Sequence, residues 1–234
     1  MKRFKVIFAV VLTFVFLSNA FPQTPIKLNL TGGVNTPLGD FAEQYKMGLS
    51  IEGGVFYSIP MAPIDLTLTA GYNSFTFKNE YFTNLVTAKL GVGVANFNPT
   101  WTATDIPIMV GARYTIPSPG YSPYIWGEAG LHLLSFKDRL IGRITGNTSN
   151  PTTLSWSGNT ESGSETVFGY AIGVGVTIPI VPKIGLDLNV KYNGNSAIYS
   201  KAFEVFRNSN SNFTNPEMKN MTFITARAGI LITL

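Results

Sequence analysis

The stretch "IPIMVGARYTIPSPGYSPYIWGEAGLHLL", from Ile106 to Leu134, decides the fold. Each half alternates apolar residues with small or polar ones, and a segment rich in Pro, Gly and Ser separates the halves. A period of two places successive side chains on opposite faces of a strand, so the stretch predicts a β-hairpin. One face of this hairpin carries charge, with Arg113 on the first strand and Glu128 and His132 on the second.

The same alternation recurs along the chain and predicts eight strands. They lie near residues 27–34, 49–59, 65–73, 106–116, 124–134, 168–178, 184–193 and 224–234. Most are longer than the roughly five or six residues of an average soluble strand and match the ~9–11 residues that cross a membrane. Pro107 cannot donate a ladder hydrogen bond, so we expect it at the outer end of its strand.

The connections between strands alternate in length. "PMAP", "PSPGYSP" and "PIVPK" are short, whereas the segments at 35–46, 76–104, 135–165 and 194–221 are long. This layout predicts an all-β, closed antiparallel transmembrane barrel of about eight strands, with short periplasmic turns and long extracellular loops.

Two hairpins allow a prediction of register. Around the turn at 60–64 we expect Tyr57 opposite Leu66 and Glu52 opposite Gly71. Around residue 180 we expect glycines to leave room for long polar side chains on the neighbouring strand. The expected partners are Gly175 with Asp187, Gly173 with Asn189 and Ala171 with Lys191.

The N-terminus has the features of a secretory signal peptide. Residues 1–20 begin with basic residues, continue in an apolar run too short to span a membrane, and end in small residues. We expect cleavage there and a barrel domain at 21–234, with an uncleaved anchor as the alternative. Three of the 17 basic residues lie in this segment, against 13 acidic residues in the chain, so the remainder is nearly neutral and predicts no nucleic-acid partner. Cysteine is absent, which excludes thiolate metal sites.

In a small membrane barrel the apolar face meets lipid and the polar face fills the lumen, the reverse of a secreted β-sandwich, which is the alternative fold. An eight-stranded barrel is only wide enough for side chains to fill it. We expect its lumen to hold a polar, ion-paired network, with a conduction path as the alternative. The expected members are Lys27, Glu52, Arg113, Glu128, His132, Asp187, Lys191 and Arg227.

His132 is the one residue that raises the question of catalysis. The lipid A deacylase class carries a His and a Ser two residues apart on a strand, but here Leu134 stands at the position of that Ser, and Ser135 falls on the opposite face. Asp105 could lie across the hairpin from His132, yet no nucleophile completes a Ser–His–acid set. We therefore expect no catalytic, cofactor or metal residues.

The motifs "PLGDFAEQYKMG", "IPIMVGARYTI", "PYIWGEAGL", "FGYAIGVGV" and "LDLNVKY" resemble the small outer-membrane β-barrel domain proteins frequent in Bacteroidota, barrels of the OmpA and OmpX type. The likeness covers essentially the whole mature chain and implies about eight strands. The end "GILITL" departs from the terminal Phe of many such barrels.

A barrel of ten strands is the alternative, if the segments 84–97 and 196–206 each add one strand.

The resemblance implies an outer-membrane location, outer-membrane lipid and the barrel-assembly machinery as partners, and little about activity. The leading hypothesis is a monomeric, non-enzymatic structural or surface-interaction protein that binds an extracellular ligand through its loops at 135–165 and 194–221. A narrow channel for small solutes is the second hypothesis, and a lipid-modifying enzyme is the third.

Overall fold

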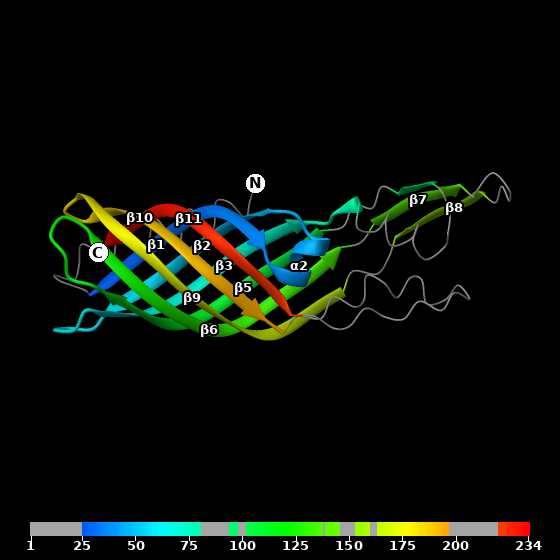
Figure 1. Cartoon of the computed structure of the whole chain (residues 1–234). Coiled ribbons are helices and arrows are strands. Elements are labelled where there is room, and N and C mark those ends of the chain that lie inside the picture. Colours follow the sequence, from blue (N-terminus) through cyan, green and yellow to red (C-terminus); the bar gives the residue numbers. More distant parts are fainter. Residues whose placement is uncertain are drawn as a thin grey trace, which may run out of the picture.

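The computed structural model describes residues 25–80, 94–97, 102–137, 139–145, 153–159, 163–196 and 220–234. Eight long strands form a closed barrel (Figure 1). They are β1 (Ile26–Pro37), β2 (Gly48–Ser58), β3 (Ile64–Thr76), β5 (Thr102–Thr115), β6 (Ser122–Lys137), β9 (Gly163–Val181), β10 (Ile184–Asn195) and β11 (Met221–Thr233). Among the described residues no helix is long and apolar enough to cross a membrane.

Each barrel strand pairs antiparallel with both of its neighbours. The order around the barrel is β1-β11-β10-β9-β6-β5-β3-β2, and β1 closes the ring by pairing with β11 from Lys27 opposite Thr233 to Pro37 opposite Phe223. Closure leaves no free edge in this sheet, and the expectation of a closed all-β antiparallel barrel with eight strands is confirmed.

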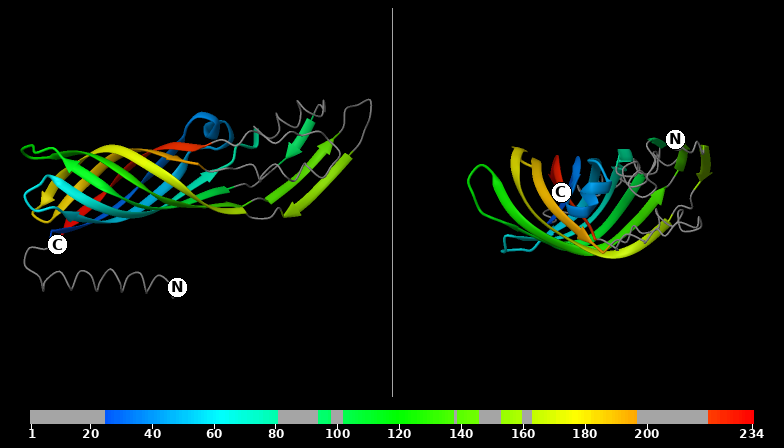
Figure 2. Two further views of the ribbon diagram at one scale, coloured as in Figure 1. Left: turned by 90° about the horizontal axis from the view of Figure 1, so that it is seen from below. Right: turned by 45° about the vertical axis from the view of Figure 1, so that its right-hand side comes forward.

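The two ends of the barrel differ. The short connections at 59–63, 116–121 and 182–183 and the C-terminus lie at one end, which we call the turn end (Figure 1). A short helix, α2 (Gly39–Gln44), lies at the opposite end, the loop end. Beyond it extends a separate three-stranded sheet of order β4-β7-β8, formed by β4 (Val94–Phe97), β7 (Arg139–Thr145) and β8 (Thr153–Asn159) (Figure 2).

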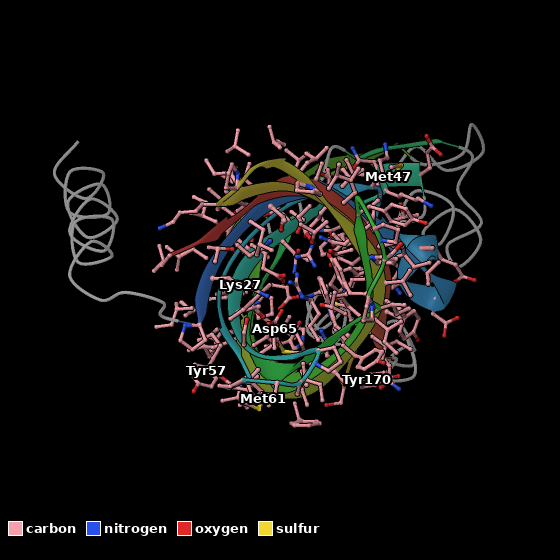
Figure 3. All side chains as sticks on the ribbon, turned by 90° about the vertical axis from the view of Figure 1, so that its left-hand side faces the viewer. Lys27, Met47, Tyr57, Met61, Asp65 and Tyr170 are labelled. Atoms are coloured by element: carbon pink, nitrogen blue, oxygen red, sulfur yellow. The ribbon has the colours of Figure 1, made fainter. Side chains whose placement is uncertain are left out.

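The alternation along each strand sorts side chains between the lumen and the outside. Figure 3 looks along the barrel axis from the turn end: Lys27 and Asp65 lie inside the ring of strands, and Tyr57 and Tyr170 lie outside it. Large apolar side chains are exposed on all eight strands. They include Leu30, Leu49, Ile51, Leu68, Val110, Ile125, Leu131, Phe168, Ile172, Val190 and Ile230. The faces are thus inverted relative to a soluble protein, with charged side chains inside and apolar ones outside.

The hairpin of β2 and β3 has the predicted register, with Tyr57 opposite Leu66 and Glu52 opposite Gly71. The predicted register of β9 and β10 is wrong by two residues, because the chain turns at 182–183 rather than around residue 180 as expected. A register irregularity at Ile184 and Gly185 follows the turn directly. Asp187 therefore lies opposite Thr177, and Gly175 and Gly173 lie opposite Asn189 and Lys191. A shift of two residues keeps every side chain on its predicted face.

Pro107 is not at the outer end of its strand, as expected, but lies inside β5 and is buried. It lies opposite His132 in the continuous ladder with β6, whereas the ladder with β3 is interrupted between Ile108 and Asp105. Pro107 has no N–H to donate, and the ladder with β3 is interrupted at this position. The interruption allows a barrel strand that is paired on both sides to contain the proline.

The ten-strand alternative is wrong for the described part of the chain, because β4 joins β7 in the separate sheet rather than the barrel. Of the segment 196–206, only Ser196 is described. The expected signal peptide at 1–20 lies outside the described residues.

Two adjacent glycines of β1 provide a test of barrel closure. A Cβ at Gly33 would lie 1.9 Å from the carbonyl oxygen of Ala226 on β11, whereas a Cβ at Gly32 would meet nothing closer than 3.7 Å. We therefore expect Gly33→Ala to destabilise the barrel by roughly 1–3 kcal/mol, the usual range for overpacking, and Gly32→Ala to leave it nearly unchanged. Urea unfolding of the two variants in lipid vesicles measures the difference, and equal midpoints would contradict this closure geometry.

Candidate functional site

The lumen is the candidate site, and its turn end is organised around Asp65 at the start of β3. Lys27 donates from Nζ to Asp65 Oδ1 at 2.9 Å, and Arg113 approaches Asp65 Oδ2 with Nη2 at 2.9 Å and Nε at 3.1 Å. Ser58 also donates a hydrogen bond, to Asp65 Oδ1 at 2.6 Å. Two cations on one buried carboxylate tie together β1, β3 and β5.

Asp187 on β10 is the second carboxylate of the turn half. It accepts hydrogen bonds from the Tyr124 hydroxyl at 2.9 Å, from Thr177 at 3.0 Å and from Asn189 at 3.0 Å. The guanidinium of Arg113 lies over the Tyr124 ring, 4.6 Å from its centroid, and its Nη1 lies 3.9 Å from Asp187 Oδ1. The positive charge of Arg113 is thereby shared between two acids and an aromatic face.

The middle of the lumen is an ionic layer of four side chains: Glu52, Glu128, Lys191 and Arg227. Lys191 Nζ lies 2.7 Å from Glu52 Oε2 and 2.9 Å from Glu128 Oε2, and Arg227 Nη1 lies 2.7 Å from the same oxygen of Glu52. Thr69 donates to the other oxygen of Glu128 at 3.0 Å. Two bases and two acids balance within a few ångströms, which is the condition under which buried charge is tolerated.

Towards the loop end the charges give way to a polar layer. His132 Nδ1 lies 2.9 Å from Asp105 Oδ1, and both side chains are fully buried. Asn73 donates to Asp105 at 3.1 Å, and Asn35 donates to Asn73 at 3.1 Å. The chain of hydrogen bonds continues from Thr225 to Asn35 and from Asn193 to Thr225.

An apolar plug fills the lumen at the loop end. It consists of Phe41, Tyr45, Phe75, Phe77, Met221 and Phe223, all almost completely buried. Helix α2 supplies Phe41, whose ring centroid lies 5.0 Å from that of Phe75, and Phe75 lies 5.1 Å from Phe223. The segment that carries α2 is fixed on both sides, since Leu38 N–H donates to Thr222 O and Lys78 Nζ donates to Ala42 O.

Glycines on β9 make room for the large lumen side chains of β6. A Cβ at Gly175 would lie 2.4 Å from the Tyr124 ring, and a Cβ at Gly169 would lie 2.4 Å from the His132 ring. Glycines of one strand thus leave room for side chains of the neighbouring strand, as expected. The space beside the β9 glycines is occupied by polar side chains of β10 and also by aromatic rings of β6.

The structure brings seven of the eight expected lumen residues into buried positions and leaves Lys27 half-buried at the turn end. The expected set omitted two members, Asp65 and Asp105. Asp65 stands on the polar face of its strand, so alternation alone could have identified it. Asp105 precedes the expected start of its strand, and only the observed start of β5 at Thr102 places it in the lumen.

The surroundings of His132 offer no catalytic arrangement among the described residues. Leu134, two residues along the strand, is buried on the lumen face, and the polar partners of His132 Nδ1 are the side chains of Asp105 and Asn195. His132 Nε2 is buried without a hydrogen-bond partner, and the ring packs against Gly169 beneath the apolar plug. In this conformation the side chains of Asp105 and His132 form a fully buried pair.

These features define a class: a closed, eight-stranded antiparallel barrel with a charged, side-chain-filled lumen and an apolar exterior. No family model and no curated protein matches the chain. Solved outer-membrane barrels have the same fold. Neisserial surface protein A matches with a TM-score of 0.50 and 13% identity over 90% of this chain and 97% of that chain. A major outer membrane protein from Thermus thermophilus matches with a TM-score of 0.50 and 13% identity over 88% of this chain and 98% of that chain. At this identity the likeness establishes the fold alone.

Substitution of Lys191 tests the ionic layer most directly, because Lys191 contacts both carboxylates of the layer, Glu52 and Glu128. We expect Lys191→Met to destabilise the barrel by roughly 3–5 kcal/mol, since Glu128 is left buried without a cation. Adding Glu128→Gln to Lys191→Met should recover part of that loss, because it removes the uncompensated charge. Urea unfolding in vesicles measures both variants, with Lys183→Met at the exposed turn as the control. Additive destabilisation in the double variant would contradict the pairing.

Proposed function

We propose that this protein is an integral outer-membrane β-barrel that acts as a non-enzymatic structural or surface-interaction protein. The observation that carries the proposal is the inverted distribution of side chains. Large apolar groups are exposed on every barrel strand, while five carboxylates and four basic side chains of the described residues are directed into the lumen. In water such an exterior would aggregate, whereas in a bilayer it is covered by lipid.

The filled lumen supports a scaffold rather than an open pore. Ion pairs, amide networks and the apolar plug occupy the barrel from one end to the other, and the sheet of β4, β7 and β8 extends past the loop end. We therefore assign ligand binding to the loop end, which we place outside the cell, with the turns in the periplasm. Loops on a rigid scaffold are the usual location of binding residues.

The remaining parts of the proposal follow from the sequence. They are export by cleavage of residues 1–20, insertion by the barrel-assembly machinery, a monomeric state and membership of the barrel proteins frequent in Bacteroidota. The motifs quoted above carry the last of these.

Membrane insertion has a direct test. A closed barrel held together by ladders around its whole circumference resists unfolding by detergent until it is heated. We expect the mature chain to fractionate with outer membranes and to migrate at different positions on a denaturing gel with and without boiling. A chain that remains in the soluble fraction and shows no mobility shift would overturn the proposal.

A narrow channel for small solutes remains the second candidate, favoured by the polar character of the lumen below the plug. Planar-bilayer recording separates the two roles. We expect no discrete openings from the wild-type barrel, because the plug and the ionic layer obstruct the lumen. Reproducible single-channel steps would favour the channel instead.

A further inference from the structure

The separate sheet of β4, β7 and β8 has free edges, in contrast to the closed barrel. Within the described ranges β8 pairs with β7 alone, and β4 pairs with β7 alone. The sheet extends past the loop end of the barrel (Figure 2). An edge strand presents a row of backbone N–H and C=O groups that can pair with another extended chain. The sheet therefore offers two edges at which a further strand can be added.

The two edges differ in how well they can hold a further strand. β4 is four residues long, and a very short strand is one of the ways in which proteins protect a sheet edge. β8 has seven residues and contains neither a charged residue nor a proline, which are the other usual protections. Of the two, β8 is therefore the edge open to strand addition.

The register of the three strands gives this sheet an apolar face. Gly142 of β7 lies opposite Trp156 of β8 and also opposite Phe97 of β4. The other residues that alternation assigns to the same face are Ala95, Leu140, Ile144, Leu154 and Gly158. A strand added to β8 has Leu154 and Trp156 as its neighbours on this face, which favours apolar residues at every second position of the added strand.

The opposite face carries the charge of the sheet. Arg139 and Arg143 both belong to it, at positions opposite Asn159 and Ser155 of β8. The three strands together contain these two basic residues and no acidic one. Positive charge without a counter-charge in the sheet favours a partner with carboxylates at the alternate positions of the added strand.

We propose that the edge of β8 binds an extended polypeptide segment of a partner, in which apolar residues alternate with Asp or Glu. The backbone of the segment continues the ladder from β7 to β8, and its acidic residues belong to the same face as Arg139 and Arg143. A second copy of this chain is a poorer partner, because its β8 has no acidic residue. This mode of binding gives the partner class for the surface-interaction role proposed above and rests on that role.

Synthetic peptides test the site directly. The probe is a labelled peptide of about ten residues that alternates Val and Glu, and fluorescence anisotropy measures its binding to the mature protein in lipid vesicles. One comparison peptide has Lys in place of Glu, and the other has methylated backbone nitrogens that cannot donate to the ladder. We expect both comparison peptides to bind roughly tenfold or more weakly than the probe. Absence of binding by the Val/Glu peptide to a heat-modifiable barrel would overturn the proposal.

Two aromatic residues at the two edges of the sheet provide a matched pair of variants. Trp156→Lys places a charge in β8, and Phe97→Lys places one in β4, each opposite Gly142. We expect Trp156→Lys to weaken binding of the Val/Glu peptide by roughly tenfold and Phe97→Lys to change it by less than about twofold. Arg143→Gln should weaken it by roughly twofold to fivefold, because it removes one cross-strand charge. Equal losses in the two aromatic variants would overturn the assignment to β8.

Hydrogen exchange of residues 153–159 reports the strand pairing itself and does not depend on a substitution. We expect the amides at the free edge of β8 to exchange rapidly in the protein alone and to become protected when the Val/Glu peptide binds. Protection before any peptide is added would show that the edge is already covered and would overturn the proposal.

Two further outcomes separate this site from its alternatives. Binding of dextran sulfate that needs Arg139 and Arg143, together with failure of the Val/Glu peptide to protect β8, would assign the sheet to an anionic polysaccharide and overturn the polypeptide partner. Peptide binding is also measured on the protein in detergent. Failure of the chain to insert into vesicles, beside normal peptide binding in detergent, would therefore count against the membrane barrel and not against the β8 site.

Discussion

The constraint on which the rest of the structure depends is the narrow lumen of a closed eight-stranded barrel. Alternation sends every second side chain inward, and the interior has room for little besides those side chains. Charge that enters this space has to be paired within it. Lys191 meets that demand most directly, because its ammonium lies 2.7 Å from Glu52 and 2.9 Å from Glu128 and so joins strands β10, β2 and β6 across the lumen.

The lumen is stratified along its axis, and each layer follows from the strands that supply it. Carboxylates with arginine and lysine occupy the turn half, an amide and hydroxyl network around Asp105 follows, and an aromatic plug closes the loop end. This gradient leaves the turn end the more polar and the loop end the more apolar.

Helix α2, only six residues long, contributes to the packing at the loop end of the lumen. It places Phe41 over the end of the barrel, and backbone hydrogen bonds on both sides fix the segment to β11 and to the end of β3. A connection between two strands thus becomes part of the lumen's packing. The connection that carries β7 and β8 extends outward instead, which divides the loop end into a sealing part and a projecting part.

The sequence by itself determined the strand number, the antiparallel order, the register of the first turn hairpin and the face of every predicted lumen residue, because a period of two is a local property of the chain. It did not locate Pro107 within β5, the bulge at Ile184 or the membership of Asp105 in the lumen, since each depends on where a ladder between strands starts or breaks. Which cation meets which carboxylate was decided only by the tertiary structure. Lys191 and Glu52 are 139 residues apart, and the curvature of the closed sheet alone brings them together.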